Sequence, residues 1–130
     1  MDLVLMYKRS AALVVVAVVR ILVAIEPQMY REVLAFHIRQ QRPRTDVVLA
    51  SAQTLEAEAK QTRPHLIVAN EVPPALKETV GYFFWVQVHM NDPLVATIRN
   101  DGYSATIPDV SLQDLLAVVD KAEEQLAYEQ

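Results

Sequence analysis

The stretch Ile21–Ile25 reads Ile-Leu-Val-Ala-Ile and is the first of five short apolar runs that predict the strands of a sheet. A continuous run of this length, rich in Val and Ile, is typical of a strand that is buried on both faces of a sheet. Four more segments have the same character and predict further strands: Val47–Ala50, Leu66–Ala69, Phe84–Val88 and Ala105–Ile107. The sequence therefore predicts five strands, and sheets of such strands are usually parallel.

Helical patterns lie between the apolar runs. The first predicted helix, Gln28–Gln41, carries an apolar stripe with further apolar residues beside it. The stripe comprises Met29, Val33, Phe36 and the stem of Gln40, and Leu34 and Ile38 lie next to it. Further helices are predicted from Gln53 to Thr62, from Pro73 to Gly81, from Asp92 to Asn100 and from Leu112 to Leu126. Strands that alternate with helices imply right-handed crossovers and a parallel sheet covered on both faces.

The composition narrows the class of function. The chain has 130 residues, which suits one domain, and a net charge of −4, which makes nucleic acid a poor partner. It contains no Cys, so disulfides and thiol catalysis are excluded and a cytoplasmic location is expected. The sequence has no nucleophile elbow, P-loop or dinucleotide fingerprint and does not predict an enzyme. Its three His residues are not spaced as metal ligands, and neither a metal nor a cofactor is predicted.

The N-terminal residues allow three interpretations. Lys8 and Arg9 precede an apolar run, as in a signal peptide, but no small-residue cleavage site follows. A membrane span needs about 20 apolar residues. Arg20 interrupts the run after nine, Ala11–Val19. The favoured interpretation splits the chain at Arg20, with residues 1–19 as an apolar extension and residues 20–127 as the domain, and it does not expect a membrane span.

Several segments resemble the receiver domains of bacterial response regulators. Arg20–Glu26, followed by Tyr30–Leu34, is similar to a receiver's first strand and the start of its first helix. Arg63–Asn70 is similar to the third strand, and Ile107–Pro108 with Leu112–Val119 is similar to the end of the fifth strand and the final helix. The resemblance covers about residues 19–126. It implies an α/β, flavodoxin-like (CheY-like) fold with a five-stranded parallel sheet of order 2-1-3-4-5 and helices on both faces.

The same resemblance implies a pocket that has lost its phosphorylation chemistry. Its positions fall on Ile25, Glu26, Asn70, His89 or Met90, and Ile107. Ile25 replaces one of the two acidic residues that hold a divalent cation, and a single Glu makes a weak Mg²⁺ site. Asn70 replaces the phosphoacceptor Asp, and its amide has no anionic oxygen to attack phosphorus. Ile107 replaces the Lys that would pair with the phosphate. The chain therefore resembles a degenerate pseudo-receiver.

The implied function is signal transduction without catalysis. Such a module would act by protein–protein contact in a two-component-type pathway, with a kinase or output protein or as a homodimer. Receivers make these contacts around the fourth helix and fifth strand, and the matching residues are Tyr103, Leu94, Ile98 and Gln113. The alternative is a small-molecule-binding domain of the same fold that uses the polar side chains of Glu26, Asn70 and His89.

Overall fold

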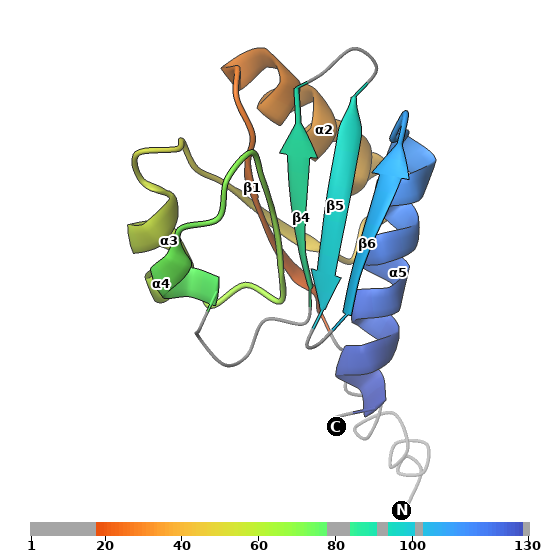
Figure 1. Cartoon of the computed structure of the whole chain (residues 1–130). Helices are drawn as coiled ribbons and strands as arrows, with labels where there is room; N and C mark the ends of the chain where they lie inside the picture. Colours follow the sequence, from red (N-terminus) through yellow and green to blue (C-terminus); the bar gives the residue numbers. More distant parts are fainter. Residues whose placement is uncertain (1–17, 78–83, 91–93, 101–102, 129–130) are drawn as a thin grey trace, which may run out of the picture.

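A computed structural model describes residues 18–77, 84–90, 94–100 and 103–128. Figure 1 shows how these residues are arranged. The predicted extension up to residue 17, the end of the third predicted helix and the start of the fourth lie outside the described residues. Val19, predicted to belong to the extension, is 3% exposed and packs in the core.

The described strands form one six-stranded sheet in the order β2-β1-β3-β4-β5-β6. Their bounds are β1 Arg20–Ala24, β2 Asp46–Leu49, β3 Leu66–Ala69, β4 Phe84–His89, β5 Val95–Asn100 and β6 Tyr103–Pro108. The first four strands pair in parallel, whereas β5 is antiparallel to both β4 and β6. The prediction of a five-stranded, all-parallel flavodoxin-like sheet is therefore wrong.

The error lies in the residues that form β5. The sequence predicts a fourth helix across Val95–Asn100, but burial alternates along this segment as expected for a strand. Val95 pairs with His89, which leaves only residues 90–94 to connect β4 to β5. A connection this short suits an antiparallel hairpin and is too short for a crossover helix. Asn100 then pairs with Tyr103 across the dipeptide Asp-Gly, which favours two-residue hairpin turns.

Helices cover the two faces of the sheet unequally. The bounds of the helices are α2 Gln28–Gln41, α3 Leu55–Thr62, α4 Pro74–Lys77 and α5 Leu112–Tyr128. Helices α2 and α5 pack on one face with residues from β1 to β5, whereas α3 and α4 pack on the other with residues from β1 and β3. Figure 1 shows α2 and α5 behind the sheet and no described helix in front of β5 and β6. None of the described helices combines the length and apolar character needed to cross a membrane.

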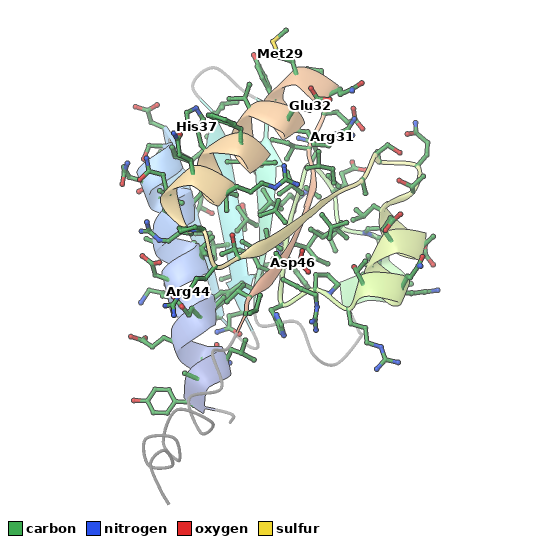
Figure 2. All side chains as sticks on the ribbon, turned by 180° about the vertical axis from the view of Figure 1, so that it is seen from behind. Met29, Arg31, Glu32, His37, Arg44 and Asp46 are labelled. Atoms are coloured by element: carbon green, nitrogen blue, oxygen red, sulfur yellow. The ribbon has the colours of Figure 1, made fainter. Side chains whose placement is uncertain are left out.

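Helix α2 has apolar residues on two opposite sides. Leu34, Ala35 and Ile38 are buried against the sheet. The stripe found in the sequence faces outward instead: Met29 is 68% exposed, Val33 49% and Phe36 58%. Figure 2 shows α2 across the near face of the molecule, with the Met29 side chain projecting beyond the helix. Leu34 and Ile38, which the sequence interpretation places beside the stripe, lie on the opposite side of the helix and anchor it.

Three Arg residues in the last turn of α2 and just after it link this helix to its surroundings. Arg39 Nη2 donates to the Val47 carbonyl at 2.9 Å. Arg42 donates to both carboxylate oxygens of Asp120 on α5, at 2.7 and 2.9 Å, and this hydrogen bonding raises the pKa of Arg42 above its ordinary value. Arg44 pairs with Glu123 of the same helix at 3.3 Å. These contacts connect α2 to β2 and the loop after α2 to α5.

Candidate functional site

An open pocket of about 770 Å³ lies at the carboxyl ends of the parallel strands. This volume is within the usual range for small-molecule sites. Its walls come from the ends of β1 and β4, the start of α3 and the loop after β3. The lining residues are Ala24, Ala52, Leu55, Asn70, Glu71, Val72, Pro73, Pro74, Gln87, Val88, His89 and Met90. Among these described lining residues Glu71 is the one carboxylate, and none is Lys or Arg.

The topology explains why a pocket forms here. Strand β1 leads into α2 on one face of the sheet, whereas its neighbour β3 leads into α4 on the other. The chain therefore diverges at the carboxyl ends of β1 and β3, which opens a crevice between them. Open α/β sheets bind ligands at such a switch point.

In this protein the Asn70 side chain bridges the crevice. The Glu26 backbone N–H donates to Asn70 Oδ1 at 2.7 Å, and Asn70 Nδ2 donates to the Val88 carbonyl at 3.1 Å. One amide thus joins the ends of β1, β3 and β4. This role requires a donor and an acceptor on the same side chain, which Asn has and an ionised Asp lacks.

Glu26 and Arg31 extend this network to β2. Glu26 Oε2 accepts from Arg31 Nη1 at 3.1 Å and from the Ala52 backbone N–H at 3.0 Å. Arg31 Nη1 also donates to the Ala50 carbonyl at 2.9 Å. The Arg31 side chain is only 11% exposed, whereas that of Glu26 is 42% exposed. We call Glu26, Arg31 and Asn70 the strand-end clasp, because together they join four strand ends through hydrogen bonds.

The structure brings together only part of the predicted pocket. Asn70, His89 and Met90 line it. Glu26 is not among the lining residues, but its backbone N–H is hydrogen-bonded to Asn70. Ile25 is 6% exposed and packs in the core on the α2 and α5 face. Ile107 lies on β6, separated from β3 by two strands, and packs against the same core. The expectation that Ile107 lies beside Asn70 is wrong because β5 stands between β4 and β6.

Polar residues continue from the pocket onto the face of β4, β5 and β6 that no described helix covers. His89 Nε2 and the Thr97 hydroxyl lie 3.1 Å apart. Trp85 lies directly opposite Arg99 across β4 and β5. The indole Nε1 of Trp85 and the Nε of Arg99 are buried without a hydrogen-bond partner among the described residues. This face belongs to the hairpin strands that the sequence interpretation assigned differently.

The three His residues lie apart in the fold. His37 is on α2, where its ring packs edge-on against Phe36 with centroids 5.4 Å apart. His65 precedes β3, at the amino ends of the parallel strands, whereas His89 lies at the carboxyl end of β4. Nδ1 of His65 accepts from the Arg20 N–H at 2.9 Å. Within the described ranges, no group of three His, Asp or Glu side chains is arranged to hold a metal ion.

The predicted interface residues differ in exposure and in position. Ile98 is 7% exposed and packs in the core, so it is not available to a partner. Tyr103 is 59% exposed but lies at the opposite end of the β5–β6 hairpin from Leu94. Gln113 is exposed near the start of α5. The predicted fourth helix is wrong over Val95–Asn100, which form β5. A partner contact through Tyr103, Leu94 and Gln113 stays a prediction.

Sequence reasoning did not predict the buried position of Arg31 or the outward orientation of the apolar stripe on α2. Arg31 lies three and seven residues before Leu34 and Ile38, which places it on the buried side of α2. A cation at such a position indicates an internal partner, because an unpaired buried charge is costly. The second feature is the outward stripe of α2. Its signal was the presence of apolar residues on two sides of one helix.

Comparison with known proteins identifies no relative: no family model, curated protein or solved structure matches this chain. The functional interpretation therefore depends on the residues and their geometry.

Replacing Arg31 by Met should lower the free energy of unfolding by about 2 kcal/mol. The Ala50 carbonyl would lose its side-chain donor and Glu26 would lose its cation, although solvent at Glu26 limits the cost. Urea denaturation measures the change. The control is Lys60→Met, which removes an exposed pair with Glu56 and should cost about 0.5 kcal/mol or less. Equal effects of the two substitutions would contradict a structural role for the clasp.

Proposed function

We propose that this domain is a non-enzymatic signalling module that acts by protein–protein contact through the outer face of α2. In this proposal it works in the cytoplasm. The observation that carries the proposal is the exposure of Met29, Val33 and Phe36 along one side of the same helix. Contiguous exposed apolar residues mark interaction sites in many proteins.

The energetics support a partner at this face. Fully burying a Met, Val or Phe side chain contributes about 1.5–3 kcal/mol. The three side chains together therefore offer several kcal/mol to a partner that covers them. Tyr30, which is 48% exposed, adds an aromatic ring beside the stripe. Aromatic residues and Met are enriched at the centres of protein interfaces.

The state of the strand ends supports a function without phosphoryl transfer. Both polar atoms of the Asn70 amide already have partners, and Glu26 Oε2 accepts two hydrogen bonds. A cation or a phosphoryl group here would meet an amide whose oxygen and nitrogen are both engaged and a carboxylate that is already paired with Arg31. Glu26 and Asn70, two of the positions given by the receiver resemblance, thus make contacts within the fold.

Acetyl phosphate or beryllofluoride with Mg²⁺ should leave the protein unmodified and its spectra unchanged. The physical reason is that Asn70 has no anionic oxygen and that Glu26 is paired with Arg31. Intact mass spectrometry and near-ultraviolet circular dichroism measure the outcome. A stoichiometric, acid-labile phosphate on this chain would overturn the proposal.

A second candidate function is the binding of a small molecule in the strand-end pocket. The specific observation in its favour is a pocket of about 770 Å³ at the switch point of the sheet. Because its described lining residues include Glu71 and neither Lys nor Arg, they favour a neutral or cationic ligand over a phosphorylated one. An ordered small molecule in contact with His89 and Gln87 would favour this function over the first.

A further inference from the structure

We propose that the partner of α2 is a second copy of this chain, bound antiparallel across a two-fold axis. The inference rests on the proposed function and names the partner at the same surface. It starts from the spacing of the outward residues, which are Met29, Val33, Phe36 and Gln40. These four residues, here called the α2 seam, recur at intervals of four, three and four. This is the spacing of a helix that packs lengthwise against another helix.

The residues beside the seam are complementary to themselves in one orientation. Glu32 and Arg39 lie along one side of the seam, and Tyr30 and His37 lie along the other. In an antiparallel helix pair, each side of the seam meets the same side of the other helix. Glu32 then faces the partner's Arg39, and the symmetry axis generates this ion pair twice. On the other side, Tyr30 faces the partner's His37.

The seam itself fits the same alignment. Val33 packs on the partner's Phe36 and Phe36 on the partner's Val33, which places two apolar layers at the centre. Met29 lies against the stem of the partner's Gln40 at each end. A parallel pair would place Glu32 beside His37 and leave Arg39 without a carboxylate. Charge complementarity therefore selects the antiparallel arrangement.

The charged groups retain capacity for these new contacts. Arg39 uses Nη2 for the Val47 carbonyl, and a guanidinium has five N–H donors. Glu32 Oε2 accepts from Gln28 Nε2 at 2.7 Å, and its other carboxylate oxygen can accept from Arg39 of the partner subunit. Both residues are exposed. Because a seam of four positions is small for a specific interface, we expect a dissociation constant in the micromolar range.

A charge-reversal experiment on the whole chain tests the arrangement. In a dimer of Glu32→Arg, each contact between position 32 and the partner's position 39 has two cations. In a dimer of Arg39→Glu, the same contact has two anions. Each variant alone should dimerise at least about tenfold more weakly than the wild type, because like charges meet across the axis. An equimolar mixture should recover dimers, since each cation of one variant then faces an anion of the other. Sedimentation velocity over a micromolar concentration series measures all four samples.

The controls address folding. Glu32→Gln and Arg39→Gln remove one charge without reversing it and should weaken dimerisation less than the reversals do. Thermal unfolding of every variant verifies that it is folded. Single reversals that dimerise as the wild type does would overturn the proposal, and so would a mixture that stays monomeric.

A labelling experiment separates failure of this inference from failure of the proposed function. The chain has no Cys, so Val33→Cys introduces a unique thiol at the centre of the seam. If the rate of maleimide labelling falls as the protein concentration and the fraction of dimer rise, a second copy covers the seam. Fast labelling of a monomer at all concentrations overturns the dimer but leaves the face open to another protein. Slow labelling of a monomer at all concentrations means that the chain's own residues cover α2, which overturns both.

Discussion

Ile38→Ala should lower the free energy of unfolding by about 3–4 kcal/mol, whereas Phe36→Ala, two residues away, should change it by about 1 kcal/mol or less. Ile38 is fully buried against the sheet, so its truncation leaves a cavity. Phe36 is 58% exposed and loses little buried surface. The difference should appear as a gap in melting temperature on the order of 10 °C.

This comparison is best made by chemical denaturation at a protein concentration low enough to keep α2 uncovered. Met29→Ala provides a further control because Met29 is 68% exposed. If Phe36→Ala destabilised the dilute protein as strongly as Ile38→Ala, the assignment of an outward and an inward side to α2 would be wrong. The exposed apolar surface that the proposed partner binds would then not exist.

Asn70→Asp, which introduces the residue type that receiver domains phosphorylate, should destabilise the fold by about 2–3 kcal/mol at neutral pH. The carboxylate would still accept from the Glu26 N–H, but it would not donate to the Val88 carbonyl. A buried carbonyl without its donor, next to a negative charge, costs more than the loss of one average hydrogen bond. Urea denaturation monitored by circular dichroism measures the change.

The matched control is Glu71→Gln, at the adjacent exposed position, which should stay within about 0.5 kcal/mol of the wild type. The Asn70→Asp variant should also remain unphosphorylated by acetyl phosphate, because Ile25 faces the core and supplies no second carboxylate. An Asp variant as stable as the wild type would show that the Asn70 amide does not bridge the strand ends.

Much of the fold was predictable because the apolar runs and helical periods are strong local signals. The strands β1, β2, β3 and β4 lie close to the predicted positions, as do helices α2 and α3. The failure at β5 has a local cause. A short polar and apolar segment after Asp-Pro is compatible with a helix start, yet Val95–Asn100 also alternates as a half-buried strand does. Pairing with β4 and β6 decided between these alternatives, and tertiary contacts often override local preference in this way.

The site was predictable only where one residue type limits the chemistry. The Asn at position 70 excludes an aspartyl phosphate whatever the fold, and the structure places it at the strand ends beside Glu26. Which polar atoms remain available could not be predicted, because the hydrogen bonds from the Ala52 N–H to Glu26 and from Asn70 to the Val88 carbonyl depend on how segments far apart in the chain meet. The position of Ile107 failed for a topological reason, since one inserted strand moves β6 away from β4.

By itself the sequence determined that strands alternate with helices in the first half of the chain, that thiol chemistry is absent and that position 70 cannot be phosphorylated. These properties are local, because they depend on the residue type and on periodicity within one segment. Only the tertiary structure decided that β5 joins the sheet, that Asn70 bridges three strands and that the apolar stripe of α2 faces outward. A helix with two apolar sides buries the side that fits the sheet, and that choice depends on packing between residues far apart in the chain.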